Sequence, residues 1–155
     1  MVMPRQDVHA QNLHHRVVLI VVRDTRGRVY LQRRAASKPL HPGLWDVSAA
    51  GHVRAGESRK DAALRELHEE LGITGVQLHE RAVHPACAAT EYSHVTLFCS
   101  SPCGTTPTPA PEEASEGMFV DADELLGLVE HCGDLITPGL RWVAQGGYLF
   151  PGSTS

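Results

Sequence analysis

Three closely spaced glutamates near the middle of the chain have the spacing that a metal-binding helix face requires. Glu66, Glu69 and Glu70 lie in a segment that also holds leucines at i, i+3 and i+7. Because an α-helix advances about 100° per residue, the leucines should point into a core and the carboxylates should share the opposite face. Carboxylates so close repel one another unless a cation lies among them. The pattern therefore predicts a helix that binds Mg²⁺ or Mn²⁺, although a solvated acidic face has the same composition.

Signals for the two ends of this helix flank the glutamates. Ser58 followed by Asp61 has the spacing of a capping box, in which a hydroxyl and a carboxylate satisfy free backbone N–H groups. Gly72 supplies the usual stop. The leucines that should face the core are Leu64, Leu67 and Leu71.

The glutamates belong to a longer pattern that starts at Gly51 and ends at Ile73. The segment reads GHVRAGESRKDAALRELHEELGI. It resembles the Nudix box, G-x5-E-x7-R-E-U-x-E-E-x-G-U, in which U is a bulky aliphatic residue. The matching positions are Gly51, Glu57, Arg65, Glu66, Leu67, Glu69, Glu70, Gly72 and Ile73.

The resemblance to Nudix hydrolases implies a role for each residue of the box. Glu66, Glu69 and Glu70 would be metal ligands, together with the Gly51 carbonyl, and Glu66, Glu69 and Arg65 would take part in catalysis. Arg65 and Glu57 would form an ion pair that orients the acidic face. Gly56 and Gly72 would support the site. The implied reaction is attack of water on a metal-held diphosphate, with a carboxylate removing the proton of the water.

The preceding segment resembles the Nudix branch that includes isopentenyl-diphosphate isomerase. In QRRAASKPLHPGLWDVSAAGHVRAGES, the groups R-R-x-x-S-K, P-G-x-W, G-H and G-E-S follow one another at matching spacing. By this resemblance Arg34 and Lys38 would grip the substrate's diphosphate, which a guanidinium and an ammonium beside a metal can do. Solvated surface charges are the alternative. Trp45 would stack on substrate, cover the site or pack in the core.

The chain departs from the isomerases at the positions that carry isomerisation. Ala50 stands where their catalytic cysteine precedes the G-H pair, and an alanine methyl transfers no proton. Their later acidic pair aligns best with Tyr92 and His94. His15 and His52 do fall on isomerase metal-ligand positions, and for His52 substrate contact or packing is the alternative to metal binding.

A general base is expected from the loop PEEASEGMFV. Many Nudix enzymes take their base from the box helix or from a glutamate before a later strand. Alignment with the isomerase branch favours Glu113, with Glu66 and Glu112 as alternatives. A solvated loop carboxylate is the other interpretation of Glu113.

Composition agrees with one soluble domain. The chain has 155 residues, 42% of them hydrophobic, and a formal charge of −4. No basic tract suggests bulk nucleic-acid binding. The apolar run Val17–Val22 is too short to span a bilayer, and the polar start has no signal-peptide core, so we expect a cytoplasmic location. The cysteines should be free thiols: Cys87, Cys99, Cys103 and Cys132.

The order of predicted elements suits an α/β Nudix fold, a mixed β-sheet sandwiched between helices. We expect a tail over 1–12 and one domain over 13–150, with a hairpin formed by strands at 15–22 and 28–33 around the turn at 24–27. Residues 100–111 should lack regular structure. The other expected strands are 46–50, 76–84, 94–100 and 117–120, and the other helices are 121–131 and 138–144.

These observations favour a metal-dependent diphosphatase acting on a nucleoside diphosphate linked to another moiety, or on a related organic diphosphate. The alternatives are a prenyl-diphosphate isomerase, against which Ala50 counts, and a catalytically silent module that binds nucleotide or ADP-ribose, against which the intact box counts. The partner should be a small molecule, and the resemblance allows a homodimer.

Overall fold

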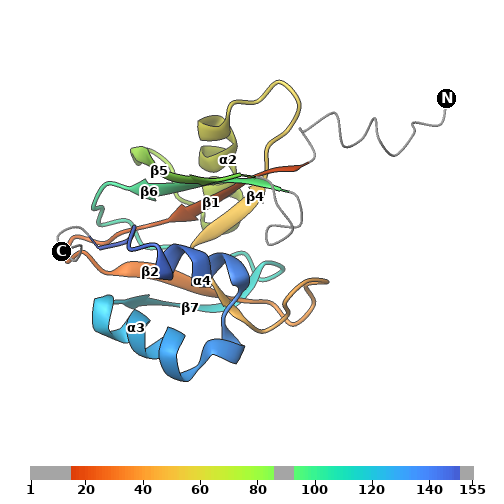
Figure 1. Ribbon diagram of the computed structural model, residues 1–155. Coiled ribbons are helices and arrows are strands. Elements are labelled where there is room, and N and C mark those ends of the chain that lie inside the picture. The colour runs from red at the N-terminus through yellow and green to blue at the C-terminus, as the bar shows by residue number, and fades with distance from the viewer. Residues whose placement is uncertain (1–14, 86–92, 151–155) are drawn as a thin grey trace.

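The computed structural model describes residues 15–85 and 93–150, which form two β-sheets and the helices that cover them (Figure 1). The α/β class with a mixed sheet is confirmed, whereas the division into two sheets was not predicted. The expectations for the tail over 1–12, for Cys87 and for Tyr92 lie outside the described residues. The strands are β1 (Arg16–Val21), β2 (Val29–Arg34), β3 (Trp45–Asp46), β4 (Ala49–His52), β5 (Leu78–His84), β6 (His94–Ser100) and β7 (Ala114–Val120). The helices are α2 (Arg59–Leu71), α3 (Ala122–His131) and α4 (Pro138–Gln145), with a 3₁₀ turn at Gly133–Leu135.

The four-stranded sheet has the order β4-β1-β6-β5, with β1 and β6 parallel and the other pairs antiparallel. Successive side chains of β1 alternate between two hydrophobic clusters. Val18 and Ile20 pack with the leucines of α2, and Leu19 and Val21 pack on the other face with residues of α4. A strand buried on both faces needs a continuous apolar run, which explains the sequence Val17–Val22.

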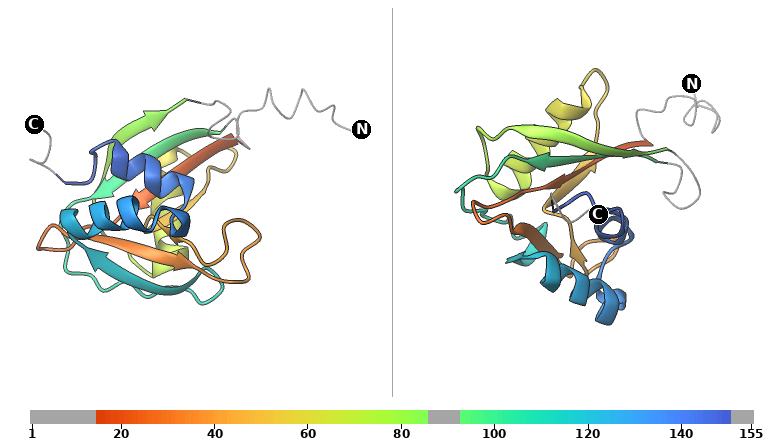
Figure 2. Two further views of the ribbon diagram at one scale, coloured as in Figure 1. Left: turned by 60° about the horizontal axis from the view of Figure 1, so that its bottom comes forward. Right: turned by 60° about the vertical axis from the view of Figure 1, so that its left-hand side comes forward.

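The three-stranded sheet has the order β3-β2-β7 and is antiparallel. Val29 and Leu31 of β2 pack against Leu125 of α3 and Leu140 of α4 in the second cluster. These two helices lie side by side (Figure 2). The alternate residues of β2, Tyr30 and Gln32, are buried on the opposite face, toward α2.

The predicted hairpin is confirmed only next to its turn, where Arg23 and Val29 form an antiparallel bridge and the Tyr30 amide donates to the Val22 carbonyl at 2.9 Å. Farther from the turn the prediction is wrong, because β1 and β2 enter different sheets. The turn itself is present, with the Gly27 amide donating to the Asp24 carbonyl. Beyond it, the Ser48 hydroxyl donates to the Tyr30 carbonyl at 2.6 Å and accepts from the Val22 amide at 2.8 Å. A side chain thus occupies the position that a continuing ladder would need, and the strands separate there.

The box helix begins and ends as predicted. The Ser58 hydroxyl accepts from the Asp61 amide at 3.0 Å, and Gly72 takes a left-handed φ of 68°. Leu67 and Leu71 are fully buried and Leu64 is partly buried. Residues 101–110 contain no helix or strand, as expected.

The single strand predicted over 46–50 is wrong, because β3 and β4 are separate strands that belong to different sheets. The strand predicted at 117–120 begins earlier, at Ala114. The predicted helix starts and free thiols are confirmed. Asp121 caps α3, and α4 starts at Pro138. Cys99, Cys103 and Cys132 are free thiols. Across residues 15–85 and 93–150, no helix has the length and apolar character needed to cross a membrane.

Candidate active site

The Arg65 guanidinium joins the loop before α2 to the acidic face of that helix. Its Nε and Nη2 donate to the two carboxylate oxygens of Glu57 at 2.8 and 3.0 Å. Nη2 also donates to the His52 carbonyl at 3.0 Å. The predicted ion pair of Arg65 with Glu57 is therefore present, in a bidentate form that fixes the guanidinium plane. The hydrogen bond from Arg65 lowers the pKa of Glu57 to about 2.

The other side of Arg65 faces the glutamates of the box. Nη1 donates to Glu66 at 2.7 Å and lies 3.4 Å from Glu69. Glu69 is also 3.8 Å from Arg54, and 47% of its side chain is exposed. As placed, Glu69 therefore points toward arginines, while Glu66 points inward. Over the described ranges, no three acidic, histidine or cysteine side chains are gathered closely enough to form a ready-made metal cluster.

Glu66 lies directly against the backbone of Gly51. A Cβ atom at Gly51 would collide with the Glu66 carboxylate, so only glycine allows this approach. The structure thus gives a steric reason for the first glycine of the box. It also places the Gly51 backbone beside the Glu66 carboxylate, as the predicted ligand set requires.

Glu70 is a buried carboxyl group, with only 5% of the residue exposed. It accepts from the Gln32 amide nitrogen and from the Ala50 backbone N–H, each at 3.3 Å. Burial and then a hydrogen bond with Glu66 raise the pKa of Glu70 well above its ordinary range, with smaller contributions from the charges of Glu66 and Glu113. Three acidic groups from α2 and the loop before β7 therefore act on one another at this point.

These residues fit a hard divalent cation. The Glu66 and Glu70 carboxyls are adjacent, offer only oxygen ligands, and repel each other unless a proton or a cation lies between them. The Gly51 backbone borders the same place. The buried Gln32 Oε1 atom has no hydrogen-bond partner among the described residues, so it remains available as a further polar group.

Both residues of the predicted diphosphate clamp are paired with acids. Lys38 Nζ donates to Glu113 Oε2 at 2.7 Å, and Arg34 Nη1 lies 3.3 Å from Asp46 Oδ2. Arg34 Nε also donates to the Leu40 carbonyl at 2.8 Å. The structure brings Lys38 and Glu113 together, which the sequence did not indicate. All four side chains are less than half exposed, so they are not solvated surface charges.

Trp45 and His52 make fewer contacts with the charged residues of the site. Trp45 is partly buried and packs with the second hydrophobic cluster, and its carbonyl accepts from the Thr137 amide. His52 is exposed, and its carbonyl rather than its ring accepts from Arg65. His15 immediately precedes β1, and His94 opens β6. Gly56 takes a positive φ of 78° in the loop before α2, a conformation that favours glycine.

A cavity of about 690 Å³ opens beside the Arg34–Asp46 pair. Its lining comes mainly from β1, β6 and α4 and combines apolar residues such as Leu19, Val95 and Trp142 with polar residues, which are His41, Asp46, His84, Ser93, Thr137, Arg141 and Gln145. Trp142 forms part of the wall and makes edge-to-face contact with His84 at 5.4 Å between ring centroids. The size and lining of this cavity are typical of a small-molecule site.

The sequence did not indicate Gln32, Asp46 or Thr137. Asp46 is 6% exposed and accepts from the Thr137 hydroxyl and the Val47 amide, both at 2.8 Å. Gln32 and Asp46 are register partners on β2 and β3, so they share one face of the sheet with Arg34. Strand alternation alone could have predicted that Gln32 and Arg34 share one face. That Asp46 joins them depends on the pairing of β2 with β3, which only the structure shows.

Comparison with known proteins agrees with this geometry. The family model described as NUDIX domain matches residues 13–138, most of the chain. The chain belongs to the Nudix family.

Related Nudix proteins carry different names. An uncharacterized Nudix hydrolase of Yersinia pestis is 49% identical over 76 residues, which are 49% of this chain and 42% of that protein. An isopentenyl-diphosphate Delta-isomerase of Cereibacter sphaeroides is 36% identical over 142 residues, covering 87% of this chain and 79% of that one. The crystal structure of DR0079 from Deinococcus radiodurans has a TM-score of 0.76 and 27% identity, covering 86% of this chain and 82% of that chain. The Nudix fold is thus shared over nearly the whole domain.

Substituting Glu57 by Gln tests the structural role of the Arg65 ion pair. Because the pKa of Glu57 is lowered from 4.5 to about 2, the pair stabilises the fold fully above about pH 4.5 and loses this contribution as the pH falls toward 2. We expect Glu57→Gln to unfold more easily than wild type near neutral pH, with a difference that shrinks below about pH 4.5. Urea unfolding at several pH values, with chelator present, measures this.

The matched control is Glu80→Gln, which removes an exposed carboxylate paired with Arg59. It should change the free energy of unfolding by less than about 0.5 kcal/mol. A Glu57→Gln difference that stayed constant from neutral to acid pH would contradict the assignment.

Proposed function

We propose that this chain is a metal-dependent diphosphatase that hydrolyses a nucleoside diphosphate linked to another moiety, or a related organic diphosphate. The observation that supports it most is the buried Glu70 carboxyl beside Glu66 and within electrostatic reach of Glu113. Burying two carboxyls that repel each other costs stability, and a divalent cation bound between them would offset that cost.

Mg²⁺ or Mn²⁺ would be held by Glu66, Glu70, Glu69 and the Gly51 carbonyl. When bound, such an ion would neutralise the diphosphate and acidify a water molecule. Arg65 holds Glu66 in place through its 2.7 Å hydrogen bond. For Glu69, whose distance to the same guanidinium is 3.4 Å, metal binding would compete with the arginines.

The diphosphate would bind the Arg34 and Lys38 side chains in place of their acidic partners. Arg34 and Lys38 each have an acidic partner in the substrate-free site, at 3.3 and 2.7 Å. Phosphate oxygens are strong acceptors for both groups. Engagement of Lys38 by phosphate would release the Glu113 carboxylate.

Glu113 is our candidate for the general base. The released carboxylate would accept a proton from the attacking water as the new O–P bond forms. The bridging O–P bond then breaks, and the leaving phosphate carries away the electron pair. Two backbone hydrogen bonds support this role: the Glu113 amide donates to the Ala110 carbonyl, and the Ala110 amide donates to the Glu70 carbonyl, both at 2.9 Å.

The organic part of the substrate would occupy the cavity beside Asp46. That cavity begins next to Arg34 and offers Trp142, Leu19 and Val95 as apolar contacts. An aromatic and aliphatic lining suits a nucleobase or another apolar group. Trp45 and His52 remain candidates for substrate contact, and His52 remains a weaker candidate for metal binding.

An isomerase of prenyl diphosphates is the second candidate, because relatives at 36% identity carry that name. Ala50 stands at the position of the isomerase cysteine, and its backbone N–H donates to Glu70. A silent nucleotide-binding module is less consistent with the complete glutamate set. A cytoplasmic location and a homodimer remain predictions.

Glu70→Gln should nearly abolish hydrolysis. The change keeps the shape of the side chain and removes the charge that would bind metal, so we expect kcat to fall by about 10² or more, roughly 3 kcal/mol in transition-state stabilisation. A panel of nucleoside diphosphate derivatives with Mg²⁺ and Mn²⁺ supplies the assay. Glu80→Gln, on the exposed face of β5, is the control. Unchanged turnover in Glu70→Gln, or full activity in excess chelator, would remove the metal assignment.

Arg34→Ala and Glu113→Gln should fail in different ways. Arg34 would bind phosphate in the ground state, so its loss should mainly raise KM. Glu113 would act as the water loses its proton, so Glu113→Gln should lower kcat with KM nearly unchanged. The deficit should shrink at high pH, since free hydroxide replaces a missing base. Profiles of kcat against pH decide this, and a Glu113→Gln variant with wild-type kcat throughout would move the base to Glu66 or Glu112.

Isomerisation should be absent. With Ala50 in place of a thiol, we expect no enzyme-dependent interconversion of isopentenyl and dimethylallyl diphosphate. NMR detection of deuterium uptake at the allylic carbon in D₂O is a direct assay. Label incorporation above the rate without enzyme would favour the isomerase instead.

A further inference from the structure

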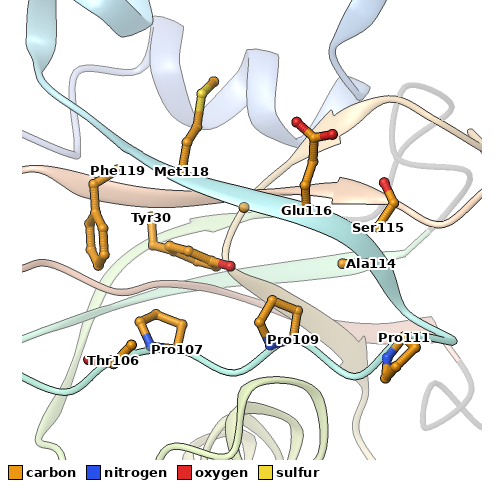
Figure 3. A pocket seen from close by; sticks show the side chains of 11 residues that line it. Tyr30, Thr106, Pro107, Pro109, Pro111, Ala114, Ser115, Glu116, Met118 and Phe119 are labelled. Atoms are coloured by element: carbon orange, nitrogen blue, oxygen red, sulfur yellow. The ribbon is translucent and has the colours of Figure 1, made fainter.

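A second cavity, of about 610 Å³, lies between β7 and the proline-rich segment that precedes it. Figure 3 shows the rings of Pro107, Pro109 and Pro111 along one side and β7 along the other, with Tyr30 between them. We call it the proline groove. It shares no lining residue with the cavity beside Asp46.

The proline wall is held in place by the last turn of α2. The Thr108 and Ala110 amides donate to the Leu71 and Glu70 carbonyls, both at 2.9 Å. These are carbonyls that the end of a helix leaves without an intrahelical partner. The alternate residues are prolines, which have no N–H to donate, and they line the groove instead.

Tyr30 brings a polar group into the groove. The residue is only 5% exposed, and its side chain lines the groove. No hydrogen bond joins its hydroxyl to another residue within 15–85 or 93–150. Burial raises the pKa of the Tyr30 hydroxyl, which therefore stays protonated and can donate. The hydroxyl is not among the fully buried atoms that lack a partner, so it faces the groove, where a bound acceptor would take the place of solvent.

The shape of the groove depends on Gly117. A Cβ atom there would collide with the Tyr30 hydroxyl, so glycine lets the phenol lie across β7. Phe119 contacts the Tyr30 ring edge-to-face, with 5.2 Å between the ring centroids. Proline rings and these two aromatic rings thus form walls suited to a flat, apolar ring.

The charges of the groove argue against a phosphate ligand. Among the described residues that line it, none is Lys, Arg or His, and the one ionisable carboxylate is Glu116. Glu116 lies at the exposed rim, 3.7 Å from Arg33. Arg28, whose guanidinium carbon lies 5.6 Å from the centroid of the Phe119 ring, is already paired with Asp24 at 2.7 Å. An anion would therefore meet no unpaired cation in the lining, whereas an uncharged molecule meets no such penalty.

We propose that the proline groove binds an uncharged heteroaromatic molecule, a nucleobase or a nucleoside without phosphate. Its ring would lie against the prolines and Phe119, and a ring carbonyl or ring nitrogen would accept from the Tyr30 hydroxyl. The site is separate from the proposed hydrolytic centre and takes a ligand that the centre's cations would not select.

Binding is tested on the full chain by two-dimensional ¹⁵N NMR, with chelator present so that the result does not depend on hydrolysis. Adenosine, guanosine, cytidine and uridine are each titrated to about 5 mM, beside the matching 5′-monophosphates. We expect at least one nucleoside to bind and to shift the amides of Thr106, Thr108, Gly117 and Phe119. Its monophosphate should bind the groove more weakly.

Tyr30→Phe removes only the hydroxyl and should weaken nucleoside binding about tenfold. Tyr148→Phe makes the same change outside the groove and should bind as wild type does. Gly117→Ala, which displaces the phenol, should also lose binding, and thermal unfolding verifies that each variant is folded. Three results would each overturn the proposal: no binding by any of the four nucleosides, amide shifts confined to the cavity beside Asp46, or binding by Tyr30→Phe that equals wild type.

Discussion

The arrangement of the site depends on one guanidinium that offsets the repulsion within a crowded acidic helix face. Arg65 binds Glu57 in bidentate fashion and reaches Glu66 and Glu69 from the same fork. A lysine could not join these carboxylates with fixed geometry, because its donors spread from a single point. The loop from His52 to Glu57 is tied to α2 by the same side chain. Loop position and carboxylate position are therefore set together.

The second constraint is the close approach of α2 to β4. Glu66 rests on Gly51, and Glu70 receives the N–H of Ala50, so the helix can carry its glutamates into the space between the sheets. The same approach brings Gln32 of the other sheet to Glu70. The box helix α2 thus contacts both sheets through polar side chains, and the apolar contacts of Leu67 and Leu71 fix its depth.

Local signals predicted most helices and strands, but pairing required the structure. Ser58, Gly72 and Asp121 act within a few residues of themselves, so their roles could be inferred from spacing. The hairpin does not extend beyond its turn because the Ser48 side chain, from a later part of the chain, lies between the Val22 amide and the Tyr30 carbonyl. Likewise, the ion pair of Arg65 with Glu57 could be predicted from the Nudix box. The contacts of Lys38 with Glu113 and of Arg34 with Asp46 could not, because they depend on how segments far apart in the sequence pack together. Periodicity carries no information on such distant meetings.

The central position of β1 also constrains how the chain reaches its folded state. β1 pairs with β6 in parallel, Val18 beside Thr96, and a long stretch of chain separates the two strands. Until β6 has been made, β1 has an unpaired edge. Because both faces of β1 are also apolar, the strand can then associate with other chains. Pairing across such a separation closes a large loop before it gains contacts, which slows folding relative to helical domains of similar size. During synthesis, β1 emerges long before β6 and cannot complete its pairing until most of the domain has been made. The yield of folded protein would then depend on whether β1 is kept from associating with other chains in the meantime.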